Sequence, residues 1–349
     1  MQAAFEVTRE DLAGLLADQP RYRTDQVWRG LWERGARPAD MTDLPKAVRE
    51  RLEAALVPAL HELLRSTSAD GTTTKWLWGL ADGRRVETVL MLYPDRATVC
   101  VSSQAGCAMA CTFCATGQGG FDRQLSVGEI VEQVVNARRE ALPRRLGNVV
   151  FMGMGEALAN YDRVWSAVQR IHSDLGISAR HITVSTVGVV PGIRRLAKEL
   201  LPVNLAVSLH AARDELRDKI VPLNRRHPLS VLMGACREYL AAKGRRLSFE
   251  WALISGVNDT ARDAAELAEL ALPLAAHVNI IPLNPTPGYA GRGTPAAGVA
   301  AFRDWLTEHG VNATVRANRG TDIDAACGQL VARERRQRPA TNTPPQARH

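Results

Sequence analysis

The sequence predicts an α/β fold, a partial (β/α)6 barrel that follows a small N-terminal helical domain. From about residue 86, short apolar runs alternate with amphipathic stretches, as expected for strand–helix units around a parallel sheet. Before about residue 75, apolar positions recur at helical spacing, as in segments 11–16 and 47–56. We therefore expect a helical domain over residues 1–85, a core domain over 86–332 and a disordered polar tail over 333–349.

The helical domain combines arginines with two tryptophans. Guanidinium groups hold an RNA backbone and aromatic rings stack on unpaired bases, so this composition predicts an RNA-binding cap. The alternative is that Trp28 and Trp32 belong to the hydrophobic core, which we expect for at least one of them. The arginines concerned are Arg21, Arg23, Arg29, Arg34 and Arg37.

The core domain contains runs that are typical of strands and of amphipathic helices. The predicted helices cover residues 126–141, 161–175 and 259–272. The predicted strands cover residues 86–91, 97–102, 148–152, 181–186, 203–209, 247–253, 278–282 and 313–316. In a barrel of such units, the active site collects at the C-terminal ends of the strands.

Composition and charge limit the possible partners. Of the 349 residues, 46% are hydrophobic, and no run approaches the roughly 18 consecutive apolar residues of a membrane-spanning helix. The first residues lack the pattern of a secretory signal, so we expect a cytoplasmic protein without membrane contact. The net charge of +7 favours a polyanionic partner such as nucleic acid.

Three of the six cysteines, Cys107, Cys111 and Cys114, stand in CxxxCxxC spacing. Three thiolates can hold a 4Fe-4S cluster and leave one iron open to a further ligand. This spacing is typical of enzymes that bind S-adenosylmethionine (SAM) at the open iron. The alternative is a zinc site, which usually takes four ligands in paired CxxC spacing and would need a distant fourth ligand here.

A longer stretch around these cysteines is similar to a known family. The run CVSSQAGCAMACTFCATGQGGFDR, residues 100–123, resembles the signature of the radical SAM RNA methyltransferases of the RlmN type. The resemblance continues through VFMGMGEALAN, VSTVGVVPGI, LAVSLHA, IVPLN, NIIPLNP and RGTDIDAACGQL. It covers nearly the whole chain, including the helical N-terminal part, and implies a radical SAM barrel.

This resemblance implies methylation of carbon 2 of an adenosine in 23S ribosomal RNA (rRNA), and of one in transfer RNA (tRNA). It implies a 4Fe-4S cluster, two SAM molecules consumed per methyl group, and a one-electron reductant such as flavodoxin or ferredoxin. We expect a monomer. The alternatives are methylation of adenine carbon 8, a metal-stabilised RNA-binding protein without catalysis, and an activase that installs a glycyl radical on another protein.

The resemblance also maps SAM contacts onto turns and strand ends. Gly155 and Glu156 follow a predicted strand, where a glycine lets the backbone approach a ligand and a carboxylate can hold its ammonium group. Ala157 stands where the family usually has proline, so we expect a less rigid turn. The other mapped residues are Ser185, Ser208, Leu209, His210 and Asn284.

Three further residues are implied to act on the methyl carbon. Cys327 resembles the cysteine that is methylated on sulfur; a 5'-deoxyadenosyl radical then removes hydrogen from this methyl group, which adds to adenine. Cys100 resembles the cysteine that resolves the protein–RNA adduct and can pair with Cys327 as a disulfide afterwards. Glu87 is the implied general base, although a solvent-facing carboxylate is the alternative. Cys236 matches no such role, and we expect it in the core.

Overall fold

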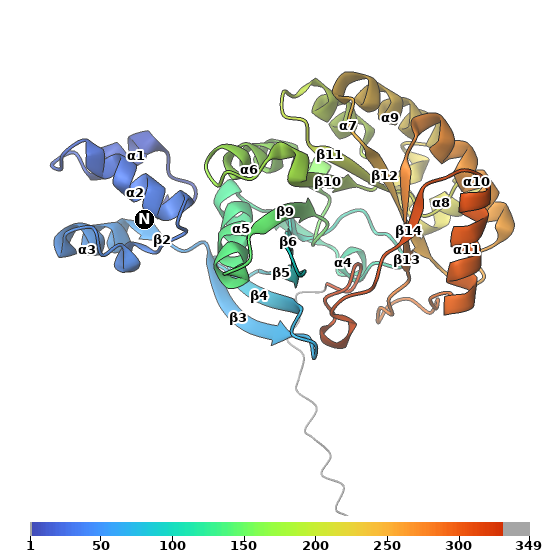
Figure 1. Cartoon of the computed structure of the whole chain (residues 1–349), viewed down its shortest axis with the longest axis horizontal. Coiled ribbons are helices and arrows are strands. Elements are labelled where there is room, and N and C mark those ends of the chain that lie inside the picture. Colours follow the sequence, from blue (N-terminus) through green and yellow to red (C-terminus); the bar gives the residue numbers. More distant parts are fainter. Residues whose placement is uncertain (1, 331–349) are drawn as a thin grey trace, which may run out of the picture.

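A computed structural model describes residues 2–330, and Figure 1 shows a helical N-terminal segment beside a curved sheet. The N-terminal segment contains helices α1 (Arg9–Leu15), α2 (Tyr22–Trp32) and α3 (Lys46–Ala55), with the 3-10 turn η1 (Pro38–Asp40) between α2 and α3. Its two ends are joined by a short parallel pair, β1 (Gln2–Ala3) and β2 (Leu56–Val57). Helix α1 begins at a capping box, in which Thr8 and Asp11 each bond the backbone N–H of the other.

The sheet has ten strands in the order β14-β13-β12-β11-β10-β9-β6-β5-β4-β3. From β6 to β14 all neighbours pair in parallel, whereas β3, β4 and β5 form an antiparallel extension at the other edge. The strands are β3 (Leu60–Thr67), β4 (Thr73–Leu80), β5 (Arg85–Leu92), β6 (Ala97–Cys100), β9 (Leu146–Phe151), β10 (Ile182–Thr186), β11 (Asn204–Ser208), β12 (Leu247–Leu253), β13 (His277–Pro282) and β14 (Ala313–Val315). A separate small hairpin pairs β7 (Gln104–Gly106) with β8 (Phe121–Gln124).

Each parallel strand from β6 to β13 is followed by helical structure, which gives six strand–helix units before β14. The predicted partial (β/α)6 barrel is therefore confirmed, and all eight predicted strands are present. The helices are α4 (Ala115–Gln118), α5 (Val127–Ala141), α6 (Tyr161–Ser173), α7 (Val190–Lys198), α8 (Asp214–Ile220), α9 (Leu229–Lys243), α10 (Ala261–Ala271) and α11 (Ala296–Glu308). Short 3-10 turns are η2 (Ala157–Asn160), η3 (Ala179–His181), η4 (Pro222–Arg225), η5 (Leu272–Leu274) and η6 (Thr321–Ile323).

The expectation of helical structure up to about residue 75 is wrong beyond Ala55. Residues 60–67 and 73–80 form strands β3 and β4 of the large sheet. Strand β3 lies at the edge and is mostly exposed, with a bulge between Glu62 and Leu64, so its sequence lacks a clear alternation of apolar and polar residues. The division at residue 85 stays a prediction, and the tail over 333–349 lies outside the described residues.

The N-terminal segment is attached to the barrel through helices α5 and α6. On α6, Arg170 donates hydrogen bonds to the backbone carbonyls of Phe5, Glu6 and Val7. Trp28 and Trp32 stack on each other with ring centroids 5.2 Å apart and are both buried. Both tryptophans therefore belong to the hydrophobic core, which is the alternative to a role in RNA binding, and neither ring is free to stack on a base.

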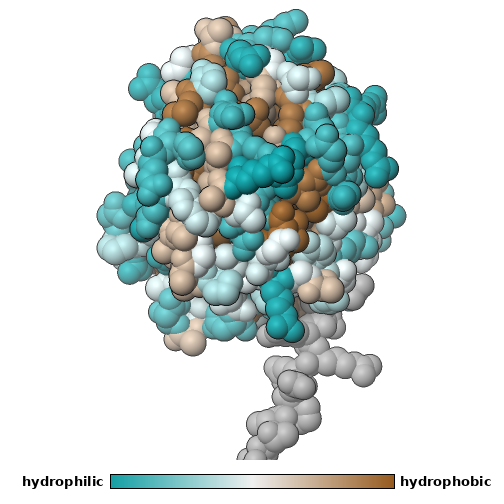
Figure 2. Space-filling model, turned by 90° about the vertical axis from the view of Figure 1, so that its right-hand side faces the viewer, coloured by the Kyte–Doolittle hydropathy of each residue, from teal (hydrophilic) through white to brown (hydrophobic). Residues whose placement is uncertain are grey.

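No helix within residues 2–330 is long and apolar enough to cross a membrane. Figure 2 shows the face on the right of Figure 1, where hydrophilic side chains surround a band of hydrophobic ones in a hollow.

Candidate functional site

A cavity lies at the C-terminal ends of the parallel strands, where active sites of such barrels collect. We call it the cofactor cavity. It is lined by the three clustered cysteines, by the glycine-rich turn after β9, and by residues at the ends of β10, β11, β12 and β13. Its polar lining includes Cys107, Cys111, Cys114, Glu156, Ser185, Ser208, His210, Glu250, Asn284 and Cys327.

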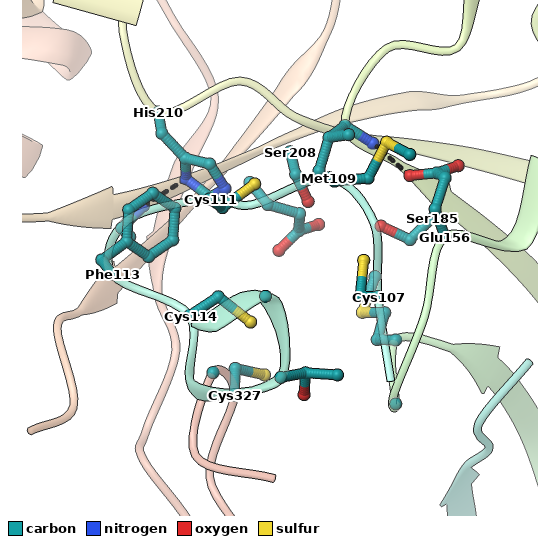
Figure 3. Close-up of a pocket in the computed structure, with 18 of the residues that line it drawn as sticks. Cys107, Met109, Cys111, Phe113, Cys114, Glu156, Ser185, Ser208, His210 and Cys327 are labelled. Carbon is teal, nitrogen blue, oxygen red and sulfur yellow. Dashed lines mark hydrogen bonds between the residues drawn. The ribbon is translucent and has the colours of Figure 1, made fainter. Parts of the chain in front are cut away.

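The loop that carries the three cysteines is fixed by its own backbone. It begins at Gly106, whose φ of +75° and whose contact with the Gly120 carbonyl leave no room for a Cβ. The Cys107 N–H donates to that same carbonyl over 2.6 Å, and Cys114 stands at the N-terminus of α4. In Figure 3 the three cysteines surround one side of the cavity, with the Phe113 ring edge-on to His210 at 4.8 Å between centroids.

The three thiols fit a cluster better than a single ion. Among the described residues, no group of three His, Cys, Asp or Glu side chains converges closely enough to hold one metal ion. In a 4Fe-4S cluster each thiolate binds a different iron, so the three sulfurs need to surround a volume rather than meet at a point. Burial raises the pKa of the Cys107 thiol to about 12, so cluster binding at this cysteine must release a proton.

The turn after β9 brings backbone and a carboxylate to the cavity wall. Gly155 has a φ of +101°, and a Cβ there would meet the Gln104 Cβ at 2.5 Å, so only glycine fits. Glu156 is buried, and its carboxylate accepts hydrogen bonds from the N–H groups of Leu158 (3.1 Å) and Val187 (2.9 Å). Burial raises the pKa of Glu156 to about 7. Ala157 begins η2 directly after it.

Of the other mapped residues, Ser185, Ser208, His210 and Asn284 line the cofactor cavity, whereas Leu209 does not. The Leu209 side chain is fully buried in the core. His210 has a φ of +62°, and its Nδ1 accepts a hydrogen bond from the Ala252 N–H at 2.9 Å. The ring is therefore neutral with its proton on Nε2, and burial lowers the pKa of His210 to about 3.

Cys327 lies in the C-terminal segment and forms part of two cavities. It lines the cofactor cavity, where the adjacent Gly328 carbonyl accepts a hydrogen bond from Ala115 next to Cys114. It also lines a second cavity together with Cys100, Val89, Arg316 and other residues of β5, β6 and the C-terminal segment. The Asn284 side chain donates to the Cys327 carbonyl at 3.1 Å and so fixes this position.

The thiols of Cys100 and Cys327 are both free, so the expected disulfide is not supported. Burial raises the pKa of Cys100 to about 12. Cys327 is exposed, and desolvation by the surrounding cavity walls raises the pKa of its thiol while the Arg316 guanidinium opposes the effect.

Glu87 is buried on β5 rather than facing solvent, which removes the solvent-facing alternative. Its carboxylate pairs with Lys75 on β4 at 3.1 Å, and Lys75 also donates to the Asp324 carbonyl at 3.1 Å. Glu87 lies outside the residues that line both cavities. The Lys75 ammonium therefore connects this carboxylate to the segment that carries Cys327.

The sequence analysis missed Glu250 and Arg316, which meet at the wall between the cavities. Glu250 lines the cofactor cavity and Arg316 the second cavity, and their side chains pair at 3.3 Å. Arg316 also contacts the Met152 sulfur at 3.8 Å. The carboxylate within the otherwise mostly apolar strand β12 could have identified Glu250 as a candidate site residue, whereas no local sequence pattern distinguished Arg316.

A comparison with family models and a comparison with curated proteins agree on the family to which this chain is similar. Residues 101–271 match the model of the Radical SAM superfamily. The chain is 52% identical over 353 aligned residues to a probable dual-specificity RNA methyltransferase RlmN of Frankia casuarinae, covering 97% of this chain and 84% of that protein. It is 51% identical to the protein of the same name from Moorella thermoacetica, covering 92% of this chain and 94% of the relative.

Among solved structures, the chain is similar to a radical SAM methyltransferase from Sphaerobacter thermophilus. The TM-score is 0.91 at 47% sequence identity, and the match covers 95% of this chain and 100% of the other. The expected radical SAM barrel is therefore confirmed.

Proposed function

The chain belongs to the RlmN family of radical SAM RNA methyltransferases, and on this premise we propose that it methylates carbon 2 of an adenosine in 23S rRNA and in tRNA. The observation that carries the proposal is the position of Cys327. Cys327 lines both the cofactor cavity and the second cavity, so its sulfur can receive a carbon on one side and present it on the other.

When bound, the 4Fe-4S cluster and SAM supply one-electron chemistry that can activate an otherwise unreactive methyl group. Cys107, Cys111 and Cys114 hold the cluster in this proposal. Glu156 binds the amino group of SAM, while the Gly155 backbone and the polar groups of Ser185, Ser208, His210 and Asn284 position its other parts. Leu209 is left out of the side-chain contacts, because its side chain points into the core.

The C-terminal segment performs the transfer. Cys327 loses its thiol proton when its sulfur accepts a methyl group from SAM, and Asn284 holds the backbone of this residue in place. The second cavity then takes the adenine base. Cys100 lines that cavity and resolves the bond between Cys327 and the RNA. Glu87 lines neither cavity and is held by Lys75, so as the general base it receives the ring proton through the groups between its carboxylate and the second cavity.

The N-terminal segment presents the RNA. Arg21, Arg29, Arg34 and Arg37 are exposed on it and can neutralise phosphates. Tyr22 is 59% exposed, so it can stack on a base, whereas the two tryptophans cannot. A one-electron reductant such as flavodoxin or ferredoxin, a monomeric state and a cytoplasmic location complete the proposal.

Anaerobic incubation of the cluster-loaded protein with labelled SAM and RNA tests this function. We expect that Cys327→Ala keeps its iron but transfers no methyl group, because the carrier sulfur is gone. Cys236→Ala is the matched control, since Cys236 is fully buried in α9 and lines neither cavity, and it should methylate at nearly the wild-type rate.

Mass spectrometry of the product locates the new methyl group. A methyl group on carbon 2 supports the proposal, and one found solely on carbon 8 contradicts it. Undiminished transfer by Cys327→Ala would remove this cysteine from the mechanism.

A further inference from the structure

Helix α8 carries a buried arginine that the proposed chemistry does not use. Arg217 is 1% exposed, although its helix reads as a charged surface segment, DELRDKI. Burial lowers its pKa to about 10, so the guanidinium remains protonated at neutral pH. A buried charge is costly unless other groups compensate it, and its surroundings therefore indicate what it stabilises.

The hydrogen bonds of Arg217 all go to neutral oxygens. Its Nε donates to the Leu209 carbonyl (2.9 Å), and its Nη2 donates to the carbonyls of Val187 (2.6 Å) and Ser208 (3.2 Å). Its Nη1 donates to the side-chain oxygen of Asn224 at 2.9 Å. These carbonyls belong to the ends of β10 and β11, where the SAM contacts are expected, so Arg217 also fixes the shape of this wall.

Asn224, in the IVPLN motif, keeps acidic groups away from the guanidinium. Its amide nitrogen donates to Asp214 (2.8 Å) and Asp218 (2.7 Å), so both carboxylates bond the amide and not Arg217. Within the part of the chain that the structure describes, Arg217 forms no salt bridge. Its positive charge is thus hydrogen-bonded to neutral oxygens, and the two carboxylates lie one amide group away from it.

The same helix supports the cluster loop. Ile220, one turn after Arg217, accepts a hydrogen bond from the Thr112 N–H at 3.1 Å, and it packs in one hydrophobic cluster with Cys111 and Phe113. Val187 and Ser208, whose carbonyls bind Arg217, line the same cavity as Cys111.

A carboxyl group lies on the other side of Val187. The N–H of Val187 donates to Glu156, and its carbonyl accepts from Arg217. The cluster cysteines therefore lie in the field of one buried cation and one buried carboxyl group, which are linked through a single residue.

We propose that Arg217 is a positioning residue whose buried charge raises the reduction potential of the 4Fe-4S cluster, and that Glu156 opposes it. On reduction, one electron enters the cluster from an external one-electron donor, the cluster gains one unit of negative charge, and no bond forms or breaks. A nearby fixed cation stabilises the more negative state, since charge and hydrogen bonding around a cluster set its potential. This inference rests on the proposed cluster ligands but not on the RNA substrate.

The test is an anaerobic redox titration of the full-length, cluster-loaded protein without SAM, at pH 8.5, with the reduced cluster followed by its electron paramagnetic resonance signal. Arg217→Met should shift the midpoint potential to a more negative value, so that at a fixed ambient potential the ratio of reduced to oxidised cluster falls on the order of tenfold. Arg217→Lys keeps the charge and should stay near the wild-type potential, although it binds SAM less tightly. Glu156→Gln should shift the potential in the positive direction.

The matched control is Arg194→Met. Arg194 lies half exposed on α7, where it pairs with Glu238 at 2.9 Å, so its removal deletes the same charge without moving the potential. An unchanged or more positive potential in iron-replete Arg217→Met, or an equal shift in Arg194→Met, overturns the proposal. If Arg217→Met cannot be loaded with iron, an unchanged potential in Glu156→Gln overturns it instead. A failure to methylate RNA would leave these potentials measurable, so the two proposals fail independently.

Discussion

The two cavities that share Cys327 are built in different ways. The cofactor cavity is formed by strand ends and by a loop whose backbone is fixed by nearby glycines. The second cavity is closed by the C-terminal segment, which is mostly irregular and is held by contacts with residues far away in the sequence. Arg319, for example, donates to Thr72 and to the Leu92 carbonyl. The cofactor side thus depends on local structure and the proposed RNA side on long-range contacts, and each can be altered without the other.

The largest effect is expected for the cluster ligands. Cys111→Ser should lose bound iron and all methyl transfer, because a hydroxyl is a poor ligand for iron in a cluster. Cys100→Ala, in the second cavity, should retain iron while losing product release. Iron and sulfide analysis after anaerobic reconstitution measures the cluster content of both variants, and labelled methyl that stays bound to the protein measures the failed release in Cys100→Ala. A Cys111→Ser protein with a complete cluster would contradict the assignment.

Lys75→Met should disrupt the second cavity and leave the cofactor cavity intact. It removes the ion pair between Lys75 and the buried Glu87 carboxylate and the hydrogen bond from Lys75 to the Asp324 carbonyl, so we expect a loss of about 3 kcal/mol in the free energy of unfolding. Methyl transfer should fall while iron content and SAM binding persist. Urea unfolding measures the loss, with Lys46→Met, which removes an exposed pair with Glu50, as a control that changes little. Equal losses in the two variants would show that the buried pair is unimportant.

Gly155→Ala should damage the cofactor cavity alone. The φ of +101° and the 2.5 Å contact with Gln104 make any side chain strained, at a cost of about 2 kcal/mol and with weaker SAM binding. Gly83→Ala is the control, because Gly83 also has a positive φ, of +80°, but the position that a Cβ would take there is open space. Calorimetry measures the SAM affinity of each variant, which should fall in Gly155→Ala and stay unchanged in Gly83→Ala. Unaltered SAM binding in Gly155→Ala would mean that this turn does not contact SAM.

The smallest effect concerns pH. The folded-state pKa of Glu156, about 7, lies above its ordinary value of 4.5, so its contribution to stability is fully present below pH 4.5 and is lost as the pH rises through 7. In the cluster-free protein, Glu156→Gln should therefore gain about 1 kcal/mol relative to wild type between pH 5 and pH 6. Unfolding at several pH values measures this gain. Parallel pH profiles for Glu156→Gln and wild type would contradict the burial of a titrating carboxyl group.

The sequence predicted the barrel and most of the cofactor cavity because both follow from local patterns. The apolar runs of the parallel strands are recognised directly in short segments, whereas the polar residues at their ends were singled out by the resemblance to a known family. It failed where burial depends on distant parts of the chain. Strand β3 was missed because an exposed edge strand has no alternation, and β4 because it is buried along nearly its whole length and has no alternation either. Lys75 and Arg217 resemble surface charges until the fold encloses them.

The antiparallel extension also sets the size of molecule that the enzyme can process. Within residues 2–330, β14 and β3 end the sheet and do not pair with each other, so the barrel does not close. In a closed barrel the interior is a packed core and ligands reach only the C-terminal face. The open edge here leaves the strand ends accessible from the side as well, so a single nucleotide can be presented while the polymer on both sides of it stays in water.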